Sequence, residues 1–279
     1  MNAILLPTDF SENSWNAIVY ALHFFRDTSC NFYLLHINRS RPIAPEYLHT
    51  EHVMEVQKIS MNSVKTQLLK LIDTIETKFP NTKHRYFAVT DQGFFIESIR
   101  RQVDEKKIDM IVMGTKGASG LKRLVIGSNT GAVITKVKCT TLIVPEKAAF
   151  NTLDEISFPT DFSLFYGVKT LEPIFEILER FNSSLRILHM GSSEKNLNMD
   201  QLKNKEFLND YLNNRKHSFH FLSNKKIEES VQCFVESRNI DLIAMVAKNL
   251  NYFQQILFHS KVQYMSYHTH VPFLVLHEK

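Results

Sequence analysis

Five of the eight glycines of this 279-residue chain lie in one stretch, MGTKGASGLKRLVIGSNTG, at residues 113–131. Their spacing includes Gly114-x2-Gly117-x9-Gly127-Ser128, and the apolar run IDMIVM directly precedes the first of them. Glycines between a strand and a helix let phosphate oxygens approach backbone N–H groups, and a helix N-terminus attracts anions. The stretch has neither the GxxxxGK[ST] loop nor the dinucleotide GxGxxG spacing. It therefore predicts a phosphate-binding loop of another kind, and the alternative is a set of tight turns.

An internal repeat identifies the elements that must position this loop. Four segments of the first half return in the same order in the second half. They are ILLPTDFS at 4–11, FYLLHI at 32–37, IDMIVMG at 108–114 and TLIVPE at 141–146, which return as ISFPTDFS at 156–163, LRILHM at 185–190, IDLIAMV at 240–246 and FLVLHE at 273–278. The offset falls from 152 or 153 to 132, so the second copy is about 20 residues shorter in its middle. The repeat predicts two homologous domains, residues 1–147 and 152–279.

Each copy alternates short apolar runs with helical patterns. In the first copy we expect strands near 3–7, 31–37, 83–90, 109–114 and 140–146, and helices near 9–28, 50–79, 94–107 and 128–138. In the second we expect strands near 155–159, 185–190, 217–222, 241–246 and 272–278, and helices near 163–181, 200–214, 227–238 and 260–269. This alternation predicts an α/β fold with a parallel sheet covered on both faces. Ligands of such sheets bind beyond the carboxyl ends of the strands, and Asp9, Ile37 and Gly114 all follow strands.

The pattern G-x2-G-x9-G-[ST] after a strand ending in Met-Gly resembles the ATP-binding signature of the universal stress protein family. PTDFS after the first strand resembles the adenine-contacting segment of that family, and the similarity covers both halves. The resemblance implies two tandem Rossmann-like, adenine nucleotide alpha hydrolase-like domains, each with a mostly parallel five-stranded sheet flanked by helices. It also implies that the two domains pair through their last strands as an intramolecular pseudo-dimer. The implied role is in stress response or regulation, without well-defined catalysis.

The resemblance also implies how the first half would hold a nucleotide. Asp9 would meet the adenine on a turn shaped by Pro7 and Thr8, and Ile37 would line the base or ribose pocket. The contacts with the ribose and the phosphates would come from Met113, Gly114, Lys116, Gly117, Gly127, Ser128, Asn129 and Thr130. ATP is the expected ligand, AMP and ADP are alternatives, and Mg²⁺ could bridge the phosphates. No catalytic or metal-ligating residue is predicted.

Two of these assignments have alternatives. Asp9 could instead cap the first helix, with Ser11 as the next candidate. In the second half, Val246 replaces Gly114 and His259 replaces Gly127, so we expect no ATP binding there. The second copy keeps Asp161 in PTDFS, which leaves an adenine-sized pocket as an expectation.

Charge, composition and missing motifs disfavour several other classes of function. The net charge is only +4, without a Lys/Arg run, which disfavours nucleic-acid binding. No apolar run reaches the ~20 residues of a membrane span and no signal peptide is recognised, so we expect a cytoplasmic protein. The three cysteines form no CxxC pair, the histidines are scattered, and no G-x-S-x-G elbow is present. The rival functions are a slow ATPase or nucleotide-transferring enzyme and a nucleotide-independent interaction scaffold. The protein partner is unknown, and a homodimer stays open.

Overall fold

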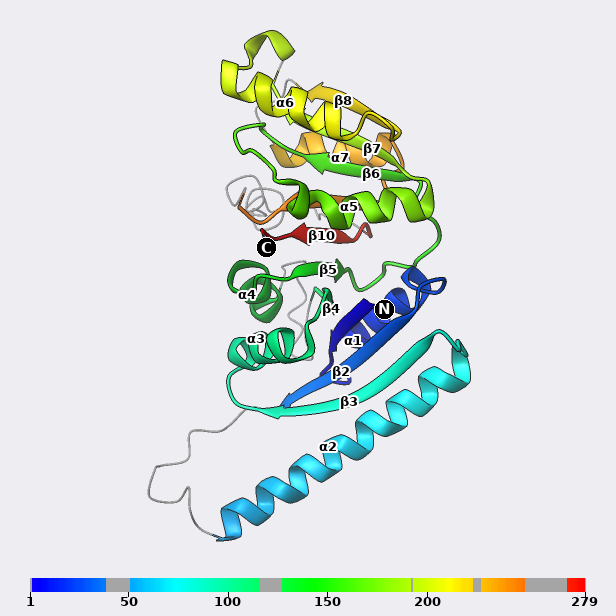
Figure 1. The fold of residues 1–279 in the computed structure, drawn as a ribbon. Coiled ribbons are helices and arrows are strands. Elements are labelled where there is room, and N and C mark those ends of the chain that lie inside the picture. The colour runs from blue at the N-terminus through cyan, green and yellow to red at the C-terminus, as the bar shows by residue number, and fades with distance from the viewer. Residues whose placement is uncertain are drawn as a thin grey trace.

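The computed structural model describes residues 2–38, 51–115, 127–191, 193–222, 227–248 and 270–278. Within these ranges ten strands form one sheet, which runs in Figure 1 from β3 near the bottom to β8 near the top. The strands are β1 (Asn2–Pro7), β2 (Cys30–Asn38), β3 (His84–Gln92), β4 (Met110–Gly114), β5 (Thr140–Val144), β6 (Glu155–Pro159), β7 (Ser184–Met190), β8 (His217–Leu222), β9 (Leu242–Val246) and β10 (Phe273–Leu276). The α-helices are α1 (Glu12–Phe24), α2 (Glu51–Lys78), α3 (Phe95–Lys106), α4 (Ser128–Lys136), α5 (Val168–Phe181), α6 (Met199–Tyr211) and α7 (Ile227–Ser237).

The sheet consists of two five-stranded halves that meet at β5 and β10. Its order is β3-β2-β1-β4-β5-β10-β9-β6-β7-β8, so the second half repeats the order of the first in reverse. Neighbouring strands are parallel everywhere except at β5 and β10, where Ile143 pairs antiparallel with Phe273. The predicted α/β fold and the pairing through the last strands are therefore confirmed. Because that one pair is antiparallel, the carboxyl ends of the two half-sheets lie on opposite edges.

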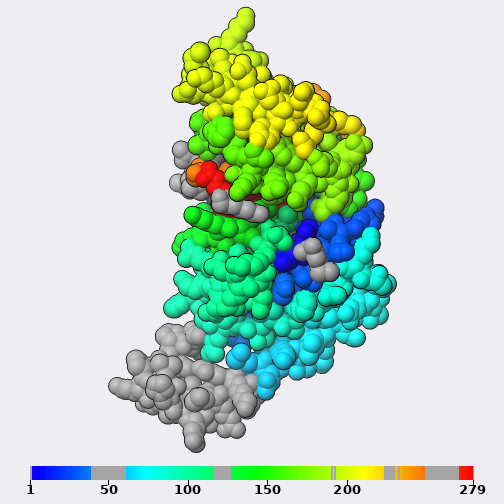
Figure 2. Space-filling model, in the orientation of Figure 1, coloured from blue at the N-terminus to red at the C-terminus, as the bar shows by residue number. Residues whose placement is uncertain are grey.

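Helices cover both faces of each half-sheet. Alternation along β1 places Ile4 and Leu6 in the core under α1 and α2, whereas Ala3 and Leu5 face the core under α3 and α4. The core under α1 continues into the second half, where it includes Ile174 of α5 and Leu208 of α6. Figure 2 shows the halves as two bands, blue to green and then green to yellow, with the red C-terminal residues between them. Among the described residues, no helix has the length and apolar content to cross a membrane.

The segment that joins the halves is packed between α1 and α5. The side-chain amide of Asn16 donates to the carbonyl oxygens of Pro145 and Ala148, each at 3.0 Å. The Phe150 ring packs edge-on against Tyr20, with ring centroids 5.4 Å apart. The residues that join 1–147 to 152–279 are thus fixed in place, and the domain boundary itself stays a prediction.

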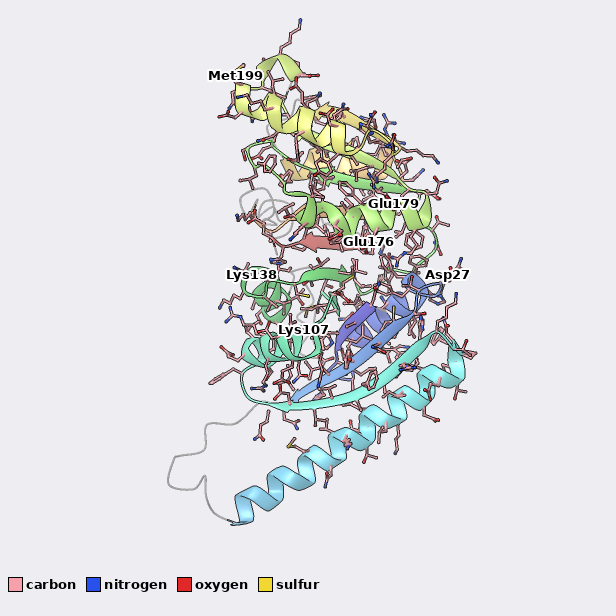
Figure 3. The ribbon with its side chains drawn as sticks, in the orientation of Figure 1. Asp27, Lys107, Lys138, Glu176, Glu179 and Met199 are labelled. Carbon is pink, nitrogen blue, oxygen red and sulfur yellow. The ribbon has the colours of Figure 1, made fainter. Side chains whose placement is uncertain are left out.

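An aromatic cluster holds the two halves together beside this segment. The Arg180 guanidinium of α5 lies 4.5 Å from the centroid of the Phe24 ring and 5.2 Å from that of Phe25. Burial lowers the pKa of Arg180, and the acidic side chains Glu176 and Asp27, one from each half, oppose that shift (Figure 3). The Arg180 guanidinium thus contacts aromatic rings of both halves, Phe24 in the first and Phe181 in the second.

One helix begins later than the sequence pattern predicts. We expected a helix from residue 163, but α5 begins at Val168. The hydroxyl of Thr8 contacts that of Ser14 at 3.0 Å, inside the first turn of α1. At the equivalent position in the second half the partner of Thr160 is Tyr166, at 2.9 Å. A tyrosine hydroxyl is farther from its backbone than a serine hydroxyl, so the same contact holds the chain away from the strand and delays the helix. The helix expected at 260–269 lies outside the described residues.

Candidate functional site

The site residues predicted in the first half converge on one edge of the sheet. β1 lies between β2 and β4, with α1 and α2 on one face and α3 and α4 on the other. This is the reversal of strand order where ligands of doubly wound sheets bind. Pro7 ends β1 beside Leu35 of β2, and Gly114 ends β4 beside Val144 of β5. Asp9, Ile37 and Gly114 therefore lie at one carboxyl edge.

The turn after β1 is built by its own side chains. The backbone N–H of Thr8 donates to the carbonyl oxygen of Leu35 at 2.8 Å. The Thr8 hydroxyl accepts a hydrogen bond from the N–H of Phe10 at 3.0 Å. The Asp9 carboxylate accepts from the N–H of Ser11 at 3.1 Å and from its hydroxyl. Ser11, not Asp9, caps α1, because its hydroxyl accepts from the N–H of Ser14. Asp9 therefore forms an exposed turn next to the cap.

Sequence reasoning missed Phe10, which forms part of this turn. Its backbone lies in the left-handed region at φ 62°, which is rare for a bulky residue. Its ring stacks on His36 with centroids 4.9 Å apart, and His36 Nδ1 lies 2.8 Å from the Thr8 carbonyl oxygen. The histidine thus links the end of β2 to the turn after β1. Ile37, the next residue, is half-buried against the core under α3.

The end of β4 differs from what the glycine pattern suggested. The Met113 side chain is buried in the core under α3 and α4, so only its backbone faces the edge. A Cβ on Gly114 would lie 3.1 Å from the carbonyl oxygen of Asn13 in the first turn of α1. This glycine thus has a packing role that the sequence did not reveal.

The N-terminus of α4 lies directly beside the end of β4. Gly127 is its N-cap, and no side chain caps the helix within the described part of the chain. The N–H of Gly127 donates to the carbonyl oxygen of Thr115 at 2.6 Å. The buried Thr130 hydroxyl donates to the carbonyl of Gly114 at 2.9 Å. The hydroxyl proton of Thr130 is therefore already donated, and this hydrogen bond links α4 to the end of β4.

Two other predicted residues lie at this helix start. Ser128 is exposed and Asn129 is half-buried. Their backbone N–H groups are in the first turn of α4, where the helix dipole favours an anion. Lys116 and Gly117 lie outside the described residues.

The second half contains the same turn with the same hydrogen bonds. The Thr160 hydroxyl accepts a hydrogen bond from the N–H of Phe162 at 3.0 Å. The Asp161 carboxylate accepts hydrogen bonds from the N–H and the hydroxyl of Ser163. Phe162 has φ 55° and stacks on His189, with centroids 5.0 Å apart. Burial lowers the pKa of His189, so its ring is held neutral beside the Thr160 carbonyl. The turn is therefore a property of the repeat.

What covers this turn differs between the halves. Phe162 is 1% exposed, whereas Phe10 is 36% exposed. In the second half, α6 lies against the turn, and the side-chain amides of Gln201 and Asn204 donate to the carbonyls of Asp161 and Phe162, both at 2.8 Å. This helix thus covers the turn at its Asp161 and Phe162 carbonyls, while Asp161 itself is half-buried, and the adenine-sized pocket stays an expectation. The glycine-loop equivalents from Asn249 onward lie outside the described residues.

Comparison with known proteins adds the family context. A family model described as the universal stress protein family matches residues 1–145. Universal stress protein YxiE of Bacillus subtilis is 26% identical over 148 residues, which cover 51% of this chain and 98% of that protein. Universal stress protein MJ0577 of Methanocaldococcus jannaschii is 25% identical over 153 residues, 52% of this chain and 94% of its own. The crystal structure of a universal stress protein from Archaeoglobus fulgidus matches with a TM-score of 0.71 and 19% identity, covering 98% of this chain and 97% of that one. At this identity the last match shows the fold alone.

Proposed function

The chain belongs to the universal stress protein family, and we propose that its first half binds an adenine nucleotide, ATP, in a stress-response or regulatory role. One observation carries the proposal: at the carboxyl edge of the first half, the exposed Asp9 turn and the α4 N-terminus follow neighbouring strands. Neighbouring strands lie about 4.8 Å apart, so the two features are within reach of one small ligand. The equivalent turn of the second half is covered by α6.

The chemistry of the two features is complementary to a nucleotide. A carboxylate accepts hydrogen bonds from an exocyclic amino group, which suits Asp9 for the adenine. Backbone N–H groups at the start of α4, with the Ser128 hydroxyl, suit the phosphates, and Lys116, Gly117 and Gly127 would complete that contact. Thr130 would hold the helix start in position.

The described residues do not supply a metal site of their own. Among them, no group of three or more His, Cys, Asp or Glu side chains could hold a metal ion. A bound Mg²⁺ would therefore take its ligands mainly from the phosphates and water, as this ion commonly does. We derive no step that depends on it.

The regulatory part of the proposal concerns the loop at 114–131. Phosphate contacts would fix the loop in one arrangement and change the surface that a partner protein or a second copy of the chain meets. The cytoplasmic location expected from the sequence belongs to the same proposal. Protease cleavage within this loop should be slower with ATP than without it, and equal cleavage rates would contradict this regulatory part.

The repeat provides a matched pair of variants for the binding test. Asp9→Ala and Asp161→Ala remove the same hydrogen bonds to a serine two residues on, so their local costs should be similar. Asp9→Ala should raise the Kd for ATP by about 10- to 100-fold, the range for a hydrogen bond to a charged group, whereas Asp161→Ala should not. Titration calorimetry measures both, and mass analysis of co-purifying nucleotide should give one per chain.

Several outcomes would contradict the proposal. Two nucleotides per chain, or an equal loss of affinity in both variants, would contradict binding by the first half alone. No binding by the wild-type protein would favour the interaction scaffold. Linear release of ADP over many turnovers, lost in Asp9→Ala, would favour the slow ATPase.

A further inference from the structure

Phe94 has the highest exposure of the exposed large apolar side chains that the structure describes, at 80%. It is the N-cap residue of α3 and makes no side-chain cap hydrogen bond. Ser, Thr, Asp and Asn are preferred at such a position because they satisfy the first N–H groups of the helix. Ser11 of α1 and Asn198 of α6 do so in this protein. A phenyl ring at this position leaves the start of α3 without a side-chain cap and exposes an apolar surface to water. Both effects lower stability, which points to a role outside the fold.

Phe94 lies at the same carboxyl edge of the sheet as the Asp9 turn and the N-terminus of α4. Ile37 of β2 pairs with Asp91 of β3, and the N–H of Gly93 donates to the carbonyl of Asn38 at 3.2 Å. Gly93 has φ 137°, a conformation that side chains rarely adopt. The next two residues then diverge: Phe95 packs into the core cluster that contains Ile37, and Phe94 stays in solvent.

The spacing of the sheet brings the ring within reach of a bound base. In the order β4-β1-β2-β3, the end of β2 is two strand spacings, about 10 Å, from the end of β4, and β3 is one more spacing of about 5 Å. A nucleotide with its phosphates at α4 would extend along this edge and place its base over Ile37. Phe94 follows the next strand and would then lie beside the base.

The second half provides an internal comparison in sequence. The offset of 132 aligns GFFIES at 93–98 with KKIEES at 225–230, so Lys226 stands where the first half has Phe94. The half that we propose to bind no nucleotide therefore has no aromatic residue at this position.

We propose that Phe94 covers the base of the nucleotide bound by the first half. This inference rests on the proposed function and adds base recognition to it. Stacking between a base and an aromatic ring contributes substantially to affinity, and it would bury an apolar ring that is otherwise in water. The phosphates contribute nothing to this contact.

Titration calorimetry with two ligands tests the proposal. Phe94→Ala should raise the Kd for ATP by about 5- to 100-fold, the range for loss of one base–aromatic stack, while the Kd for inorganic triphosphate stays unchanged. Phe94→Trp should retain ATP affinity, and ATP should quench the fluorescence of the introduced indole beyond any change at Trp15. Leu69→Ala is the control, because Leu69 is also exposed, at 52%, but lies on α2.

Each other outcome overturns the proposal. An unchanged Kd for ATP in Phe94→Ala would refute base covering while leaving nucleotide binding by the first half intact. Equal weakening of ATP and triphosphate would place the effect at the phosphates or in the fold. No ATP binding by the wild-type protein would overturn both the proposed function and this inference.

Discussion

Replacing Gly114 by valine, the residue of the second half, tests why this strand ends in glycine. A Cβ at this position would lie 3.1 Å from the carbonyl oxygen and 3.4 Å from the carbonyl carbon of Asn13. Both atoms belong to the backbone of α1, so they cannot rotate away as a flexible side chain would. The second half accommodates Val246, and there the helix after the equivalent turn begins only at Val168.

The size of the effect follows from two opposing terms. Gly114 is not among the glycines with left-handed φ, so backbone strain adds nothing, and a side chain there would reduce the entropy of the unfolded chain. That gain is about 0.4–1 kcal/mol. Forcing two further methyl groups against α1 costs about 1–3 kcal/mol, as in other overpacked cores. We expect Gly114→Val to lower the free energy of unfolding by about 1–2 kcal/mol and Gly114→Ala to be close to neutral.

Urea unfolding of nucleotide-free protein, followed by circular dichroism, measures these values. Truncating Asn13 to alanine should not rescue Gly114→Val, because the nearest contacts are with backbone atoms. If Gly114→Val is as stable as the wild-type protein but no longer binds ATP, the packing explanation is wrong and the glycine serves the ligand.

Two further predictions concern the junction between the halves and the acid sensitivity of the fold. Arg180→Ala removes a cation that lies over the rings of Phe24, Phe25 and Phe181, and should lower the free energy of unfolding by about 1–3 kcal/mol. Arg180→Lys should have an intermediate stability. Equal midpoints of urea unfolding for the wild-type protein and both variants would contradict this prediction. Burial, and secondarily Lys138, lowers the pKa of His277 to about 4, so the folded state binds fewer protons than the unfolded state. Its contribution to stability is present above the unfolded pKa of about 6.5 and is lost as pH falls toward 4. His277→Gln should therefore lose less stability than the wild-type protein between pH 7 and pH 5, and parallel pH profiles would contradict this assignment.

Hydrophobic periodicity predicted most elements of the fold. The helix expected at 94–107 is α3, Phe95–Lys106, and the segment expected to be helical from about 50 to 79 is α2, Glu51–Lys78. Strand bounds agreed to within one or two residues, because buried parallel strands are short apolar runs between turns. The pairing of β5 with β10 followed from the family resemblance, since periodicity does not specify which strand edges meet.

The start of α5 could not be read from the repeat. PTDFS is identical in both copies, so the same helix start was expected after each. The change from Ser14 to Tyr166, five residues beyond Asp9 and Asp161, alters the length of a side chain and hence the path of the backbone. Such an effect depends on a contact with the strand, which local propensity does not report.

The candidate site was predictable in outline only. Strand ends and glycine spacing indicated the edge at which Asp9, Ile37 and Gly114 lie. They could not indicate that Met113 faces the core, that the Thr130 hydroxyl is bonded to Gly114, or that α6 covers the second turn. Each of these depends on residues distant in sequence.

The repeat therefore separates the features that speak for a ligand from those that do not. The PTDFS turn occurs in both halves with the same hydrogen bonds, so its presence alone does not indicate a nucleotide. Gly114 is explained by its contact with α1, and the second half lost the glycine together with the early helix start. The case for a nucleotide then depends on what only the first half retains: an exposed turn at Asp9, Gly127 at the start of α4, and the ring of Phe94 in solvent. Because these lie beyond β1, β4 and β3, a ligand that contacts all of them must extend along the edge of the sheet, which suits a nucleotide better than a compact anion.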